Sequence, residues 1–301
     1  MRINLKIFSI TLLAFLMLAS TALAKPSSFQ RFNTSLVSKS GSKLNQSIGL
    51  RINPFHVIGL AGGPTNAGNL NSGAVMESLP FATKFANVYL PKQIVLNLGV
   101  FPKCKFDVAL NAPDTCPKGS EIGLKNVNPA CATLVPMTCT VYASGLVRNF
   151  NSPAGIYLLK TTLTIRLFVA KTDAYGRPAS NLLALRVLSP LSGNVIISGK
   201  ISKLPTSHKF GSKIRFNIPA GLVVPFPGLV SQLYDFNAGI KKAFYAGKPL
   251  VKLTKCPSTR RLLFGYNGEF NINGQLGANT TPDNQFKINE VGPVITKKVK
   301  C

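Results

Sequence analysis

Apolar and polar residues alternate along much of the chain, which is the pattern of β-strands with one buried face. In the clearest example, between residues 161 and 169, four apolar side chains spaced two apart fall on one face: Leu163, Ile165, Leu167 and Val169. Similar alternation predicts strands over 85–98, 194–202, 213–218, 248–255 and 261–273. Turn-forming prolines separate several of these stretches. Many short strands with turns between them favour an all-β sandwich over alternating strands and helices.

One segment departs from this alternation. Between Pro227 and Lys248 the apolar residues recur near helical spacing, at Leu229, Val230, Leu233, Phe236, Ile240 and Phe244. Lys241 and Lys242 come toward its end, where positive charge suits the helix dipole. We therefore predict one short helix that covers an end of the sandwich, with a helix lying on a membrane surface as the alternative.

The first 24 residues have the features of a secretory signal peptide. Arg2 and Lys6 are basic, residues 7–18 are apolar or small, and residues 21–24 form a small-residue cleavage site. We predict cleavage after Ala24 and a secreted or extracytoplasmic protein. No later stretch reaches the roughly 18 to 20 apolar residues of a membrane-spanning helix, so we expect no integral membrane span.

Shifts in composition divide the rest of the chain. Residues 25–46 are polar and predict a flexible basic leader, and the Gly/Asn/Ser-rich stretch 59–73 predicts a long loop. A turn-rich stretch at 148–153 follows one strand and precedes the longest one. We therefore predict a first β domain over 47–148 and a second over 153–301, as two sandwich-like halves.

The charge balance indicates which partners the protein attracts. The 301 residues include 35 Lys and Arg against 9 Asp and Glu, for a net charge of +26, and loss of Arg2 and Lys6 with the signal peptide leaves +24. An apolar content of 46 % indicates a folded protein with a basic exterior, not a disordered polycation. Outside the cytoplasm, such a surface attracts anionic envelope polymers or anionic lipid headgroups, and nucleic acid is the less favoured partner. The plain alternative is that the charge serves solubility.

Candidate anion-binding residues gather in the C-terminal part of the chain. They are Lys241, Lys242, Arg260, Arg261, Lys297, Lys298 and Lys300. Phenylalanines interleave with the cations in several places, but strand alternation alone points most of these rings inward and the cations outward. We therefore expect electrostatic binding, without base or sugar stacking as its basis.

Six cysteines follow the predicted cleavage site, and an even number in an exported chain predicts three disulfides. Fifteen pairings of six cysteines are open from sequence alone. Closure of short loops favours Cys104 with Cys116 and Cys131 with Cys139, which leaves Cys256 for Cys301. A zinc site is disfavoured because the chain has no C-x-x-C and its histidines are not at ligand spacing.

A motif lies around the first two cysteines. The sequence FPKC at 101–104 is followed by CPKGSEIG at 116–123. This resembles the FPxC…CPxxSxIG signature of a group of uncharacterised exported actinobacterial β-rich proteins, which also tend to carry a later Cys-Pro, here at Cys256, and a cysteine near the end, here Cys301. The resemblance implies an exported β fold and supplies no catalytic residue. Cys131 and Cys139 are not part of the signature.

Groups suited to catalysis are scarce. The two histidines, His56 and His208, lie in loop-like settings, and either acts as a general base only if an acid orients it. Asp114 and Glu121 are a close acidic pair, within and just after the predicted Cys104–Cys116 loop. The sequence has no G-x-S-x-G elbow, phosphate-binding glycine loop or calcium-ligand cluster. We expect no catalytic residue, cofactor or metal.

These observations predict an exported, non-enzymatic binding or structural protein of the cell envelope or the extracellular space. It would associate with anionic polymers or lipid surfaces through its basic surface. Two alternatives stay open: a carrier of an apolar ligand in a cavity of the β-sandwich, and a hydrolase of envelope polymers that uses Glu121 or His208.

Overall fold

The computed structural model describes residues 30–37, 48–56, 82–124, 143–151, 156–223, 225–226, 229–271 and 290–301. The predicted signal peptide, the predicted loop at 59–73 and the predicted Cys131–Cys139 disulfide lie outside these residues.

Most described residues form strands. Twelve strands make one sheet, in the order β1-β2-β10-β5-β6-β7-β8-β9-β3-β14-β15, with β16 also paired to β14. These strands are β1 (Gln30–Val37), β2 (Gly49–His56), β3 (Ala82–Leu90), β5 (Ala143–Asn151), β6 (Ile156–Thr172), β7 (Pro178–Ser189), β8 (Gly193–Lys203), β9 (Ser212–Asn217), β10 (Leu229–Ile240), β14 (Arg261–Asn271), β15 (Glu290–Val291) and β16 (Ile295–Lys300).

The remaining elements are short. Two small two-stranded sheets pair β4 (Ile94–Leu96) with β13 (Val251–Leu253), and β11 (Phe244–Tyr245) with β12 (Lys248–Pro249). The helices are α3 (Phe106–Asn111) and α4 (Ala220–Val223), with the 3-10 turns η1 (Leu98–Val100) and η2 (Pro113–Thr115). The predicted all-β fold is confirmed.

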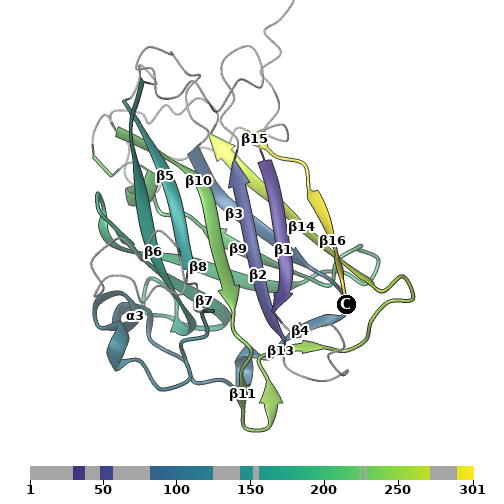
Figure 1. Cartoon of the computed structure of the whole chain (residues 1–301). Helices are drawn as coiled ribbons and strands as arrows, with labels where there is room; N and C mark the ends of the chain where they lie inside the picture. Colours follow the sequence, from purple (N-terminus) through teal and green to yellow (C-terminus); the bar gives the residue numbers. More distant parts are fainter. Residues whose placement is uncertain are drawn as a thin grey trace, which may run out of the picture.

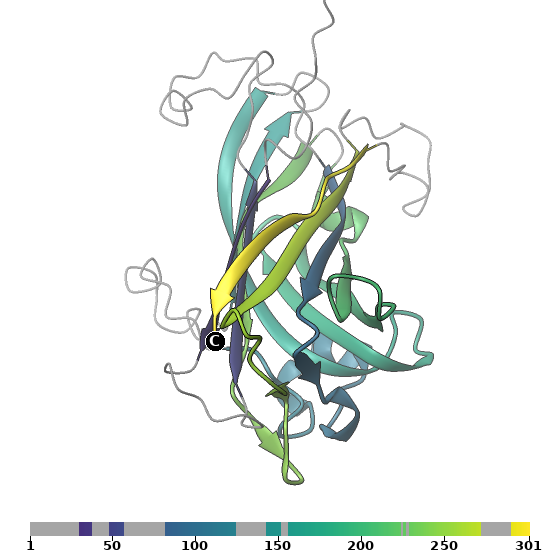
Figure 2. The ribbon, with the colours of Figure 1, turned by 90° about the vertical axis from the view of Figure 1, so that its right-hand side faces the viewer.

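The long sheet folds back on itself into two layers (Figures 1 and 2). β1, β2, β10 and β5 lie side by side in one layer, and β8, β9, β3 and β14 lie in the other. β6 and β7 join the layers on one side, and β1 packs beside β16 on the other. Every ladder in the sheet is antiparallel.

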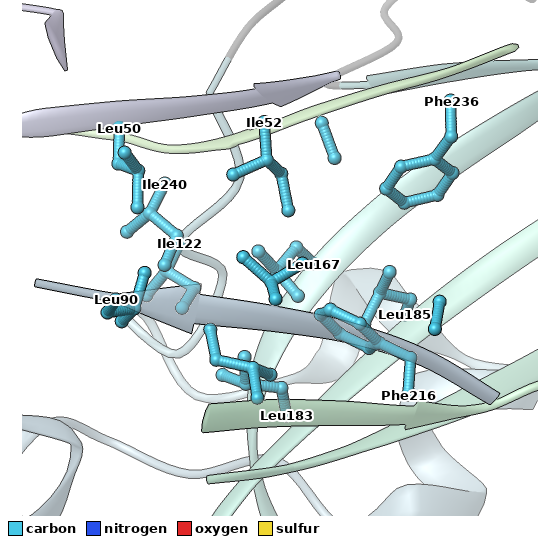
Figure 3. Close-up of a cluster of buried hydrophobic side chains, with 14 of the residues drawn as sticks. Leu50, Ile52, Leu90, Ile122, Leu167, Leu183, Leu185, Phe216, Phe236 and Ile240 are labelled. Carbon is cyan, nitrogen blue, oxygen red and sulfur yellow. The ribbon is translucent and has the colours of Figure 1, made fainter. Parts of the chain in front are cut away.

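One apolar core fills the space between the layers. Alternate residues of the strands supply it, as at Leu163, Ile165, Leu167 and Val169, whose period-two spacing predicted a half-buried strand. Figure 3 shows Phe216 and Phe236 meeting from opposite layers, with Leu167, Leu183 and Leu185 beside them. The strands predicted over 85–98, 161–169, 194–202, 213–218, 248–255 and 261–273 correspond to β3 and β4, β6, β8, β9, β12 and β13, and β14.

The helix predicted between Pro227 and Lys248 is wrong, because residues 229–240 form β10. Phe236, Ala238 and Ile240 are two apart and buried, so they also satisfy a strand pattern. Asn237 and Gly239 also have low helix propensities. The strand gains a ladder on both edges, to β2 and to β5, and these long-range pairings outweigh the local helical spacing.

The predicted leader is only partly a leader, because residues 30–37 form β1. This strand pairs with all of β2, and Gln30 and Phe32 are buried. The ring of Phe32 stacks on that of Tyr266 in β14 at a centroid distance of 5.6 Å. The polar composition of this stretch concealed a strand because its exposed positions, Arg31, Asn33 and Ser35, are all polar.

The predicted boundary at 148–153 does not separate two sheets. β10 lies between β2 and β5, and β3 lies between β9 and β14, so strands from both sides of the boundary alternate in one sheet. They also share one core, to which Leu50, Val88, Ile165 and Phe264 all contribute.

The residues of the FPxC…CPxxSxIG motif fill a gap in one layer. β5 begins at Ala143, opposite Ile165, and so leaves the end of β6 unpaired on that edge. Ile122 N donates to Leu167 O at 2.8 Å, and Cys104 N donates to Val169 O at 2.9 Å. On the other side, Lys241 N donates to Ile122 O at 2.9 Å, which joins the motif to the end of β10. The Cys104–Cys116 disulfide closes the loop between the two parts of the motif.

Candidate anion-binding end

A cluster of like charge surrounds the second disulfide, which pairs Cys256 with Cys301 as predicted. The disulfide joins the segment that precedes β14 to the end of β16. Six basic side chains lie on these two segments, and all are exposed; we call them the basic end: Lys255, Arg260, Arg261, Lys297, Lys298 and Lys300.

Local folding positions the first half of the basic end. Leu253 ends β13, and Thr254 is held by two hydrogen bonds to Gln93 O, at 2.8 Å from its backbone nitrogen and 3.1 Å from its hydroxyl. The chain then turns, with Arg260 N donating to Pro257 O at 2.8 Å. Arg260 closes this turn at φ 51°, in the left-handed region that costs a non-glycine residue roughly 1 kcal/mol. Cys301 N donates to Arg260 O at 3.1 Å, which fixes the end of β16 against the turn.

The β14–β16 ladder positions the second half. Arg261 faces Lys300 across the ladder, and Leu263 faces Lys298. Lys298 and Lys300 are two apart, so both point to the same face as Arg261. Lys297 points to the other face, opposite the buried Phe264, but remains exposed at the sheet edge. The ladder therefore places three cations side by side on one surface.

Four of the described carboxylates are bound elsewhere by arginines. Arg166 binds Asp114 and Glu121, Arg177 binds Asp173, and Arg215 binds Glu269 at N–O distances of 2.7 to 2.9 Å. Neither segment of the basic end, 255–261 or 295–301, contains an acidic residue. Within the described part of the chain none of the six side chains pairs with a carboxylate. Their mutual repulsion therefore remains uncompensated, which favours binding of an external anion.

Lys241 and Lys242, the other two candidate residues, lie apart from this cluster. They follow β10 and lead into the β11–β12 hairpin (Figure 1), where Lys241 is half-buried and Lys242 is exposed. The structure thus brings together five of the seven predicted anion-binding residues and adds Lys255. Lys255 was not among the predicted residues, although its position next to Cys256 of a predicted disulfide indicates that it belongs to this cluster.

The residues considered for a hydrolase are engaged in packing. The imidazole of His208 packs against the rings of Tyr89 and Phe210, at centroid distances of 6.2 and 5.6 Å, and its Nδ1 accepts a hydrogen bond from Phe210 N at 3.2 Å. Glu121 is bound through both oxygens by Arg166, at 2.9 Å each. That hydrogen bonding raises the pKa of the Arg166 guanidinium, against the opposing effect of its burial.

The interior leaves little space for an apolar ligand among the described residues. A cavity of about 50 Å³ lies between the layers, lined by apolar side chains that include Val88, Ile165, Phe216 and Phe236. A second cavity of about 20 Å³ lies beyond the same two phenylalanines. An apolar cavity that holds benzene measures about 150 Å³, so an acyl chain requires the core to open. The carrier hypothesis stays a prediction without support from the cavity size.

Three other findings bear on function. No cluster of three or more potential metal-ligating His, Cys, Asp or Glu side chains occurs among the described residues. In the same part of the chain, no helix has the length and apolar character needed to span a membrane. Comparison of the chain with protein-family models, curated proteins and solved structures found no match. The resemblance to the exported actinobacterial group therefore stays a prediction.

Proposed function

We propose that this is a non-enzymatic extracytoplasmic protein that attaches to anionic polymers or anionic lipid surfaces through its basic end. The observation that carries the proposal is the convergence of six exposed cations around the Cys256–Cys301 disulfide, with no described carboxylate to neutralise them. The predicted signal peptide supports the extracytoplasmic placement, and two disulfides are compatible with it.

Binding in this proposal is driven by charge. Lysine and arginine side chains that approach phosphate or carboxylate groups displace counterions, so affinity falls as the salt concentration rises. Each basic residue close to an anionic membrane surface contributes about 1 kcal/mol. Three cations held together by a ladder and a disulfide lose little conformational freedom of the backbone when they bind.

The test is co-sedimentation or retention across a salt series with three probes: long-chain polyphosphate, alginate, and vesicles of phosphatidylcholine with phosphatidylglycerol. The variant carries Arg261→Gln, Lys298→Gln and Lys300→Gln. The matched control carries Lys200→Gln, Lys203→Gln and Lys209→Gln, three exposed lysines on β8 and on the loop that follows it, which give the same change in net charge.

We expect the basic-end variant to bind at least one probe about a hundredfold more weakly than the unaltered protein at low salt. The affinity of this variant also falls less steeply as the salt concentration rises, since fewer counterions are released. The control variant loses much less. Equal losses in both variants would show that net charge alone is responsible, and indifference of binding to salt would exclude the electrostatic mechanism.

A further inference from the structure

A second feature of the same molecule indicates which anionic surface it binds. The β11–β12 hairpin consists of Phe244 and Tyr245 paired with Pro249 and Lys248. Ala246 and Gly247 connect them with φ values of 48° and 72°, so both central residues are left-handed, as a two-residue type I′ turn requires. Figures 1 and 2 both show this hairpin projecting from one end of the sandwich.

The hairpin carries two aromatic side chains that the fold leaves in water. Phe244 is 55 % exposed and Tyr245 is 44 % exposed. The Tyr245 ring rests on Phe101 at a centroid distance of 5.7 Å, and Phe101 is itself buried beside the first disulfide. Tyr245 therefore holds the hairpin against the core, while Phe244 on the opposite face of the strand stays exposed; we call residues 244–247 the tip.

Two exposed cations flank the tip. Lys242 and Lys248 are exposed on the hairpin and on the segment that leads into it. Phe101 also borders an open hollow of about 660 Å³, to whose lining Lys103 and Lys171 contribute. The neighbouring sequences 98–105 and 241–252 contain no acidic residue.

We propose that the β11–β12 hairpin inserts into the interfacial region of an anionic lipid bilayer, with Phe244 at the depth of the upper acyl chains. The inference rests on the proposed function and narrows its partner to a lipid surface. Tyr245 then lies at headgroup level, which is where tyrosine concentrates in membrane interfaces, and the flanking lysines reach the lipid phosphates.

The shape of the tip favours lipid over an acidic polysaccharide. Sugar binding through aromatic rings needs a flat or concave platform on which a ring can stack. Phe244 instead lies on a narrow projecting hairpin (Figure 1) and is 55 % exposed, so a surrounding medium can cover it on several sides. The upper acyl region is such a medium, and the lysines around the tip select bilayers that carry negative charge.

The chain contains no tryptophan, which makes a direct test possible. Phe244→Trp places a unique indole at the tip. Tyr175→Trp is the matched control, because Tyr175 is 74 % exposed on the turn between β6 and β7. Each variant is mixed with vesicles of phosphatidylcholine and phosphatidylglycerol, with and without brominated acyl chains, and its emission is recorded.

We expect the emission of Phe244→Trp to shift to the blue and to be quenched by brominated chains, while that of Tyr175→Trp does neither. Phe244→Ser, made in the unaltered protein, then weakens vesicle binding by about tenfold and leaves binding to polyphosphate unchanged. Tyr175→Ser weakens neither.

Two results overturn the insertion and separate it from the proposed function. If vesicles bind in a salt-dependent way while the Phe244→Trp indole stays in water, attachment is electrostatic only and the hairpin is not an anchor. If polyphosphate or alginate binds while vesicles do not, the partner is a polymer. If none of the three probes binds at low salt, both proposals are overturned.

Discussion

Arg166 binds Glu121 through two parallel hydrogen bonds, from Nε to Oε1 and from Nη2 to Oε2, each 2.9 Å long. Its Nη1 donates to Asp114 at 2.8 Å, and its guanidinium lies 5.3 Å from the ring centroid of Phe168. Arg166 is on β6, whereas Asp114 lies within the loop closed by the Cys104–Cys116 disulfide and Glu121 lies just after it. These two carboxylates thus fasten the loop and the segment that follows it to the sheet.

Glu121→Gln tests this role. The amide keeps the size of the side chain but loses the charge, and Arg166 then retains one carboxylate partner instead of two. Because both side chains are about four-fifths buried, we expect the free energy of unfolding to fall by about 1 to 2 kcal/mol in urea denaturation.

Asp173→Asn is the control, since it also replaces a carboxylate that binds an arginine. Its partner Arg177 is 70 % exposed, so this change should have a clearly smaller effect. Losses of the same size would mean that Glu121 does not fasten the loop. If the protein were a hydrolase that uses Glu121, Glu121→Gln would abolish turnover while the protein remained folded.

The Cys256–Cys301 disulfide closes a loop with a sequence separation of 45, against 12 for Cys104–Cys116. On the chain-entropy model the longer loop contributes about 4 kcal/mol and the shorter one about 3 kcal/mol. We expect Cys256→Ala with Cys301→Ala to lower the free energy of unfolding by about 4 kcal/mol. Since the same disulfide joins the two segments of the basic end, this variant should also bind anionic vesicles more weakly.

Comparison with the double variant Cys104→Ala, Cys116→Ala separates the loss of stability from the loss of vesicle binding. That pair of changes also destabilises the protein but leaves the basic end intact. If both double variants lose vesicle binding equally while still folded, the disulfide at the basic end has no particular role in binding.

Burial raises the pKa of the Tyr266 phenol above its ordinary value of 10. Below pH 10 the phenol is neutral in the folded and unfolded chain, so this group has no effect on the pH dependence of stability. Above pH 10 the unfolded chain releases the proton and the folded protein does not. The free energy of unfolding then falls as the pH rises, by about 1.4 kcal/mol per pH unit.

Urea denaturation at a series of pH values above 10 measures this slope. Tyr266→Phe should reduce it, and a smaller slope should remain because burial also raises the pKa of Tyr89. With seven tyrosines and no tryptophan, tyrosinate absorbance follows the same event directly. A slope unchanged by Tyr266→Phe would contradict the buried, neutral phenol.

Gly199 on β8 lies directly against the core. A Cβ at this position would be 2.5 Å from Cε1 of Phe216 and 3.3 Å from Cβ of Leu183. Gly199→Ala should therefore push the Phe216 ring aside and lower the free energy of unfolding by about 1 to 3 kcal/mol. Gly221→Ala is the control, since a Cβ there meets nothing within 4 Å and alanine favours the helix α4. It should leave stability unchanged or slightly higher.

The elements predicted correctly are those whose pattern is local. β6, β8, β9 and β14 show alternation within their own sequence. Cys104–Cys116 is a pair that closure of a short loop favoured, and Cys256–Cys301 is the pair that this choice left over. Sequence reasoning identified no strand at β1, β7 or β16, and it assigned β10 to a helix. β10 also fits a helical pattern, and only its pairing with β2 and β5 decides the outcome.

The charged residues of the candidate site could be predicted from the sequence, but their arrangement in space could not. Arg260, Arg261, Lys298 and Lys300 stand out as charge in the sequence, but that they lie on one surface follows from the β14–β16 register. The hairpin with Phe244 and Tyr245 was included in the supposed helix, where both rings would have been ordinary contacts. A two-residue turn that begins with alanine gives little warning in sequence, because asparagine or glycine is usual there.

The place of β10 between β2 and β5 sets the order in which the protein can fold. Asn53 on β2 donates to the backbone of Phe236, 183 residues later. At synthesis rates of 5 to 20 residues per second, the hairpin of β1 and β2 waits roughly 10 to 40 s for this partner. During that time the faces that carry Phe32, Leu50 and Ile52 have no core to cover them. The apolar faces of this hairpin therefore become buried only after β10 has joined it, and long-range pairing of this kind slows folding.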